Sequence, residues 1–125
     1  MNIGTLLLIG TSGGAGAAVR YLAGVLFPEH HRVWSTVCVN LLGSFLLGIF
    51  TSIWAGSSTQ EIEFLAICGT GFCGGLTTFS ACSVDAIELL ATHRRLTMIL
   101  YLSATILGCI AAVIAGFTAA SYLRV

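Results

Sequence analysis

Four long apolar segments, separated by short polar connections, constrain the fold of this 125-residue chain more than any other feature. They cover about residues 3–27, 33–55, 62–90 and 96–123. Each is long enough to cross a bilayer, for which a helix needs roughly 20 residues. Of all residues, 57% are hydrophobic and 8% are charged, against about 25% charged in soluble domains. The sequence therefore predicts an all-α, multi-pass protein of the plasma membrane, with a single membrane domain over residues 1–125.

The connections and the remaining composition exclude several classes of protein. Connections this short place consecutive helices side by side and antiparallel. The residues after Met1 carry no basic stretch and no clear cleavage site, so we expect the first segment to be retained. The chain has no lysine and no basic patch, which argues against nucleic-acid binding. It has no evident nucleophile–base pair, so we expect no enzyme, and its five cysteines match no zinc spacing.

The third segment has a glycine- and threonine-rich stretch at its centre. The stretch reads Cys68-Gly-Thr-Gly-Phe-Cys-Gly-Gly-Leu-Thr-Thr-Phe-Ser80. Each glycine costs a helix about 1 kcal/mol relative to alanine, and the segment is longer than the ~30 Å hydrocarbon core requires. We expect the helix to break here, where freed carbonyls can bind a cation and freed N–H groups can face an anion. The alternative is a continuous helix whose small residues allow close packing.

Two polar side chains interrupt the first two segments. Arg20, near the end of the first, either marks a functional site in the membrane or extends its long side chain to the interface. Asn40 lies near the middle of the second segment, on the same helix face as Ser44. A buried amide is costly unless it is paired. Asn40 therefore either bonds a neighbouring helix or donates its amide N–H groups to an anion.

Small and weakly polar residues recur at helical spacing in the outer segments. The fourth segment carries a stripe formed by Tyr101, Thr105 and Cys109. It is either a hydrated track or a set of side chains bonded back to their own helix. In the first segment, Gly10 and Gly14 have the G-x-x-x-G spacing that favours close helix contact.

The polar groups within the segments are mostly neutral donors, and aromatic ring edges add partial positive charge. Phe79 and Ser80 belong to this set, together with Thr77 and Thr78. Such groups suit a small anion, whereas a proton-coupled pump would need a carboxylate near the middle of the membrane. Four helices form a thin bundle, which favours an oligomer.

The arginines are weakly biased toward one side of the membrane. Arg32, Arg94 and Arg95 lie in the first and third connections, and Arg124 lies on the opposite side. The positive-inside rule then places these connections in the cytoplasm and both termini outside. A bias this small is compatible with insertion in both orientations and with an antiparallel dimer.

Over nearly its whole length, the chain resembles the Fluc (CrcB-type) fluoride channels. The resemblance rests on three motifs in order: Gly13-Gly-Ala-Gly-Ala-Ala-Val-Arg20-Tyr21, Val37-Cys-Val-Asn40-Leu-Leu-Gly43-Ser-Phe-Leu-Leu-Gly48, and Gly71-Phe-Cys-Gly-Gly-Leu-Thr-Thr-Phe-Ser80. It implies a dual-topology, antiparallel homodimer in the membrane lipid, with two pathways for passive fluoride export.

The resemblance also implies roles for individual residues. It implies a third helix broken at Gly74–Thr77, where the backbone carbonyls of Gly74 and Thr77 from both subunits would hold a structural sodium ion. Arg20 and Asp85 would belong to the vestibule. The fluoride pathway would be lined by Asn40, Phe79, Ser80, Cys82, Tyr101 and Thr105.

The chain departs from the family pattern at three positions. Cys82 stands where the family has a second phenylalanine, Asp85 where its usual acidic residue is longer, and Cys109 where serine is usual. The chain therefore either conducts with one phenylalanine per pathway or pairs with a paralogous subunit that supplies the missing ring. A further alternative is a small four-helix multidrug or cation exchanger. Such exchangers rely on a glutamate in the first helix, where this chain has Arg20 and no acid.

Overall fold

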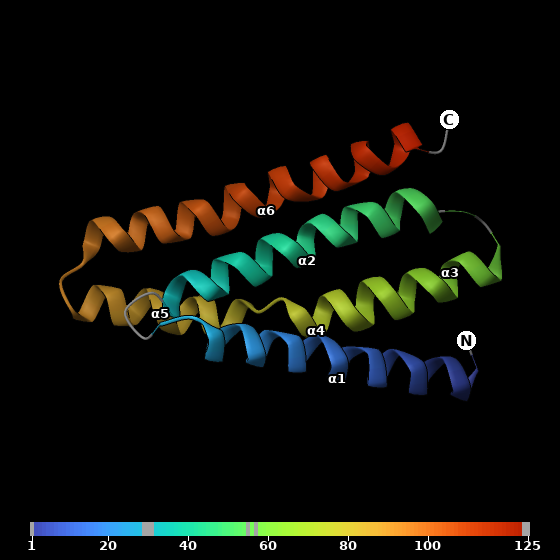
Figure 1. Cartoon of the computed structure of the whole chain (residues 1–125), viewed down its shortest axis with the longest axis horizontal. Coiled ribbons are helices and arrows are strands. Elements are labelled where there is room, and N and C mark those ends of the chain that lie inside the picture. Colours follow the sequence, from blue (N-terminus) through green and yellow to red (C-terminus); the bar gives the residue numbers. More distant parts are fainter. Residues whose placement is uncertain (1, 29–31, 55, 57, 124–125) are drawn as a thin grey trace.

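The computed structural model describes residues 2–28, 32–54, 56 and 58–123, and every regular element within them is a helix (Figure 1). Four helical spans are long and apolar enough to cross a membrane. They are α1 (Ile3–Leu26), α2 (Arg32–Trp54), a third span (Thr59–Ala91) and α6 (Arg95–Leu123). The expected bundle of four membrane-spanning helices is confirmed.

The third span is divided into four helical pieces. They are α3 (Thr59–Leu65), the π-helical η2 (Ala66–Cys73), the short α4 (Gly74–Leu76) and α5 (Phe79–Ala91). The chain leaves the helix at Thr77, where ψ is 156°, and at Thr78, where φ is −152° and ψ is 125°. The expected break at the centre of the span is confirmed.

The break falls at the two threonines, and the preceding glycines stay helical. β-Branched residues are restricted in a helix, and threonine side chains compete for backbone hydrogen bonds. Thr77 Oγ1 donates to the carbonyl of Cys73 at 2.9 Å, and Thr78 Oγ1 accepts the N–H of Ala81 at 3.2 Å. The threonines therefore end one helix and begin the next.

The glycines of the stretch allow α1 to approach closely. A Cβ atom at Gly75 would overlap the backbone of Gly13, and a Cβ at Gly16 would overlap the carbonyl of Phe72. Within the described chain, no atom outside their own helix lies within 4 Å of a Cβ placed at Gly10 or Gly14. The expected G-x-x-x-G contact is therefore not made inside the chain, because α1 turns its Gly13 face toward the third span.

The spans are arranged side by side in the order α6, α2, third span, α1, and both termini lie at the same end (Figure 1). α2 packs along α6 and also touches the third span, while α1 packs mainly against η2 and α4. The most buried cluster lies where α2, α5 and α6 meet, and it consists of Val37, Cys82, Ala86, Leu89 and Tyr101. The helix break lies next to this cluster along α5.

Candidate functional site

Asn40 faces the break from α2 and is 6% exposed. Its Oδ1 accepts the backbone N–H of Thr78 at 2.7 Å, and its Nδ2 donates to the Thr78 carbonyl at 3.1 Å. An extended residue has no helical partners for these groups, and in lipid each unsatisfied group costs several kcal/mol. Asn40 thus bonds a neighbouring span, which was one of the two alternatives. An amide nitrogen carries two hydrogens, so one N–H remains.

A pocket of about 460 Å³, which we call the break pocket, lies beside the break, between α2, the third span and α6. It is lined by Asn40, Gly43, Ser44, Leu47, Gly69, Thr70, Cys73, Gly74, Thr77, Thr78, Phe79, Cys82, Thr105, Ile106 and Cys109. The structure therefore brings Asn40, Phe79, Cys82 and Thr105 together around one pocket, and their role in a fluoride pathway stays a prediction. Ser80 and Tyr101 lie outside this lining.

Phe79 is the first residue of α5, and its side chain is 83% exposed in the single chain. Ser80 is exposed as well, and its hydroxyl lies 3.2 Å from that of Thr78. An aromatic ring and a hydroxyl therefore project from the bundle at the middle of a membrane span. Phe79 forms part of the pocket wall, whereas Ser80 belongs to the outer face next to it.

Tyr101 is fully buried and takes part in a polar cluster on the other side of α5. The Asp85 carboxylate accepts hydrogen bonds from Thr36 at 2.8 Å and from Tyr101 at 2.9 Å, both at Oδ2. This cluster ties α2, α5 and α6 together. Sequence reasoning missed Thr36, because a lone threonine in an apolar span usually bonds its own helix. Its spacing of four residues before Asn40 was the available signal.

Thr105 and Cys82 both line the pocket, but their hydrogen bonding and burial could not be read from their residue types. Thr105 donates its hydroxyl hydrogen to the Tyr101 carbonyl at 2.8 Å, so it presents only oxygen lone pairs to the pocket. Cys82 is 2% exposed and packs in the buried cluster with Tyr101. Phe79 is the only aromatic side chain in the described lining of the pocket.

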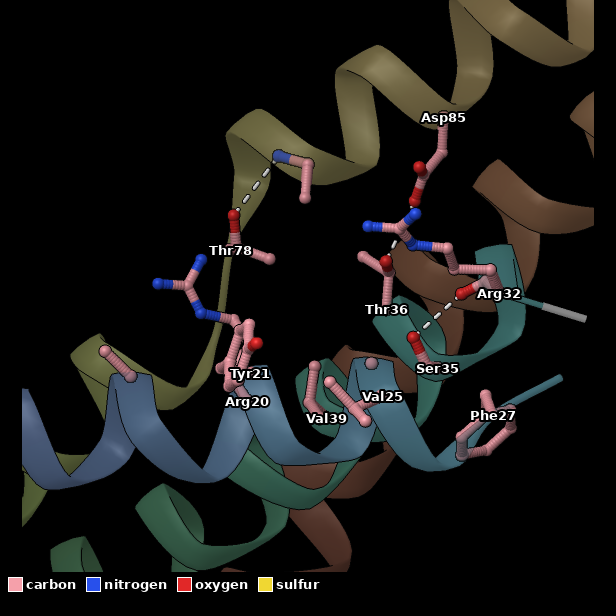
Figure 2. Close-up of a pocket in the computed structure, with 13 residues that line it drawn as sticks. Arg20, Tyr21, Val25, Phe27, Arg32, Ser35, Thr36, Val39, Thr78 and Asp85 are labelled. Atoms are coloured by element: carbon pink, nitrogen blue, oxygen red, sulfur yellow. Dashed lines mark hydrogen bonds between the residues drawn. The ribbon is translucent and has the colours of Figure 1, made fainter. Parts of the chain in front are cut away.

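A second pocket, which we call the vestibule, has a volume of about 610 Å³ and is lined by residues of α1, α2 and the third span (Figure 2). It is lined by Ala17, Arg20, Tyr21, Gly24, Val25, Phe27, Arg32, Ser35, Thr36, Val39, Thr78, Ala81 and Asp85. Arg20 and Asp85 both line this pocket. Thr78 lines both pockets, so the break forms part of the wall between them.

The vestibule is lined by two arginines, Arg20 and Arg32, and by one carboxylate, that of Asp85. Arg20 Nε is buried and has no hydrogen-bond partner among the described residues. Figure 2 shows the Arg20 guanidinium extending toward the segment at Thr78, while Asp85 is bonded to Thr36. A cation in a partly desolvated pocket attracts anions more strongly than one in water. The arrangement can therefore draw an anion from solution toward the break.

Backbone carbonyls are the candidate ligands for a cation at the break. In the described part of the chain, no group of three or more histidine, cysteine or acidic side chains can hold a metal ion. Unwound helices in membrane proteins bind sodium through carbonyl oxygens. Gly74 is the first residue of the short α4, and Thr77 follows its last residue, where the helix unwinds.

Comparisons with known proteins agree with these features. A family model described as "CrcB-like protein, Camphor Resistance (CrcB)" matches residues 7–117. The "Fluoride-specific ion channel FluC 2" of Rhodococcus jostii is 38% identical over 115 residues, covering 90% of this chain and 96% of that protein. A "Fluoride-specific ion channel FluC" of Methanopyrus kandleri is 40% identical over 116 residues, covering 92% and 88%. Another from Gloeobacter violaceus is 36% identical over 121 residues, covering 94% and 96%.

These names describe ion channels, which are not enzymes, in agreement with the sequence analysis. The matches extend over nearly the full length of both partners, and the family model covers all four spans at least in part. With its four spans and its break in the third, this chain belongs to the CrcB-like protein family.

Proposed function

We propose that this protein is a fluoride-selective channel of the plasma membrane that lets the anion leave the cytoplasm passively. The observation that carries the proposal is the broken third span with Asn40 and Phe79 beside it, in a chain whose relatives are named fluoride-specific ion channels. Fluoride enters cells as the neutral acid and dissociates inside. The membrane potential contributes about 2.3 kcal/mol per elementary charge for every 100 mV, so a negative interior drives the anion out without further coupling.

The two pockets give the anion a route past the break. Fluoride enters the vestibule near Arg20 and then passes Thr78, which borders both pockets. In the break pocket it meets the remaining N–H of Asn40 and the positive ring edge of Phe79. These are neutral donors, which bind a small anion without holding it as tightly as a fixed cation would.

The channel works as an antiparallel homodimer. Phe79 is 83% exposed, and Thr70, Gly74 and Ser80 are exposed around it, at the middle of the third span. Lipid offers no hydrogen bonds to polar groups at this depth. A second copy on this face buries them, and the small arginine bias permits the opposite orientation that antiparallel pairing needs.

A structural sodium ion lies at the centre of this dimer, bound by the carbonyls of Gly74 and Thr77 from both subunits. A continuous helix would give these carbonyls the N–H groups of Thr78 and Ala81. Here Thr78 donates instead to Asn40, and Ala81 donates to the Thr78 hydroxyl. These two bonds leave the Gly74 and Thr77 carbonyls without their helical donors, which supports their assignment as ligands of a hard cation.

The test is ion release from liposomes that contain this chain alone, followed with a fluoride electrode and a chloride electrode. Fast fluoride release without chloride release is the expected result for a selective homodimer. Release of neither ion contradicts the homodimer, and release of both contradicts selectivity. Liposomes containing no protein provide the baseline.

A second candidate function is a subunit that conducts only with a paralogous partner. The specific observation is Cys82, which is buried and leaves Phe79 as the only ring in the described lining of the pocket. Co-reconstitution with a paralogue that carries both phenylalanines would then restore flux that this chain alone lacks. An exchanger is disfavoured, because α1 contains no carboxylate.

A further inference from the structure

We infer that the side chains of Asn40 and Thr78 keep the break open, and so keep the carbonyls of Gly74 and Thr77 free for the cation. The inference rests on the proposed sodium site. It assigns Asn40 a positioning role in addition to its place in the anion pocket. One side chain would thus serve both the cation site and the fluoride route.

The first step concerns the N–H of Thr78. In an α-helix each N–H bonds the carbonyl four residues earlier, which for Thr78 is that of Gly74. Asn40 Oδ1 takes this hydrogen at 2.7 Å, a short distance for an N–H···O bond. The Asn40 amide also donates to the Thr78 carbonyl at 3.1 Å. Held on both sides, Thr78 keeps its extended conformation and cannot close over Gly74.

The second step concerns the N–H of Ala81. In a continuous helix this group would bond the carbonyl of Thr77. It instead donates to Thr78 Oγ1 at 3.2 Å, the usual arrangement of a residue that caps the start of a helix. The geometry depends on the extended backbone of Thr78, with φ at −152°. Asn40 therefore keeps both carbonyls free of helical hydrogen bonds. It does so directly for Gly74, by accepting the Thr78 N–H, and indirectly for Thr77, by holding Thr78 extended.

A role confined to the anion pathway makes a different prediction. If Asn40 only donated a hydrogen bond to fluoride, replacing it would change the fluoride flux and leave cation binding unaltered. If Asn40 and Thr78 hold the break open, replacing either side chain lets the helix close over a carbonyl. The dependence of stability on sodium separates the two roles.

The experiment measures the thermal unfolding midpoint of the purified full chain in sodium and in a large organic cation. The variants are Asn40→Leu, which removes the amide at similar volume, and Thr78→Val, which removes the hydroxyl but keeps the β-branch. The control is Thr51→Val on α2, because that hydroxyl bonds the Leu47 carbonyl of its own helix at 2.8 Å. We expect sodium to raise the midpoint of the wild type and of Thr51→Val. We expect this increase to be lost in Asn40→Leu and reduced in Thr78→Val.

An unchanged sodium effect in both variants overturns the inference and leaves the sodium site standing. A wild type without any sodium effect overturns the sodium site and the inference together, while the liposome measurement still decides the fluoride function. If Asn40→Leu does not fold, Thr78→Val carries the test together with the Thr51→Val control. A sodium effect in Thr78→Val equal to that of the wild type then contradicts the inference.

Discussion

Phe79 and Cys82 lie about one helical turn apart on α5 and have opposite environments. Phe79 is 83% exposed in the single chain, and Cys82 is 2% exposed in the cluster around Tyr101. Burial alone would suggest that Cys82 is purely structural, yet both residues line the break pocket. The exposed ring and the buried thiol are three residues apart on one face of α5, and both border the same pocket.

We expect Phe79→Ile to lower fluoride flux by up to about tenfold while the proposed dimer stays intact. Isoleucine keeps the apolar bulk but lacks the positive ring edge, and such aromatic contacts contribute about 0.5–1.5 kcal/mol, where about 1.4 kcal/mol corresponds to a factor of ten. Fluoride efflux from liposomes, together with the mass in detergent, checks this. Phe117→Ile on the exposed side of α6 is the matched control. Undiminished flux in Phe79→Ile would remove this ring from the pathway.

We expect Cys82→Phe to destabilise the chain by about 1–3 kcal/mol, because a larger side chain overfills a closely packed core. Thermal unfolding measures the loss, and Cys38→Phe serves as a control because Cys38 is exposed. The same variant tests conduction. Fluoride flux equal to that of the wild type would mean that a ring at this position is dispensable.

Tyr101→Phe tests the polar cluster directly. The variant removes one of the two hydrogen bonds to Asp85 Oδ2 and leaves that of Thr36. Hydrogen bonds to charged groups contribute about 1.5–3 kcal/mol, so we expect a stability loss of that size. A melting temperature equal to that of the wild type would show that the hydrogen bond from Tyr101 to Asp85 does not stabilise the protein.

Among the helices, the contact between α1 and the third span depends on glycine at particular positions. We expect Gly16→Ala to lower stability, because its Cβ would overlap the Phe72 carbonyl, which belongs to rigid backbone. Gly14→Ala is the matched control on the same helix, since a Cβ there meets no atom of the described chain beyond its own helix within 4 Å. Thermal unfolding of the two variants compares them. Equal stability would contradict the close contact seen at Gly16.

The sequence predicted the number of helices and the break, but it did not distinguish the roles of the glycines and the threonines. Hydropathy and length determine where a span lies. The break depended on Thr78 and its partner Asn40, a contact between residues 38 positions apart that no local pattern reveals. The π-helical turns of η2 were not predicted, because a change in hydrogen-bond register leaves no trace in composition. The motifs predicted most of the residues that line the pocket. They also predicted Tyr101 and Ser80, which the structure places outside the lining.

For the assembled protein, the exposed face around the break is the surface that most needs a partner. We expect Gly74→Leu to leave the fold of the single chain intact but to abolish the dimer, because a Cβ at Gly74 meets no atom of the described chain beyond its own helix within 4 Å. Light scattering in detergent measures the mass. Ala111→Leu on the exposed side of α6 is the control. A Gly74→Leu protein that remains dimeric would place the dimer contact elsewhere.

The amide clamp on Thr78 also bears on the order in which the protein is made. Asn40 precedes Thr78 by 38 residues, so the second span is synthesised before the break. In lipid each unsatisfied backbone group costs several kcal/mol, and an unclamped third span is therefore most stable as a continuous helix. It would enter the bilayer unbroken and unwind only once the second span docks beside it. The proposed ion site would then form late in assembly, in a chain that is already in the membrane.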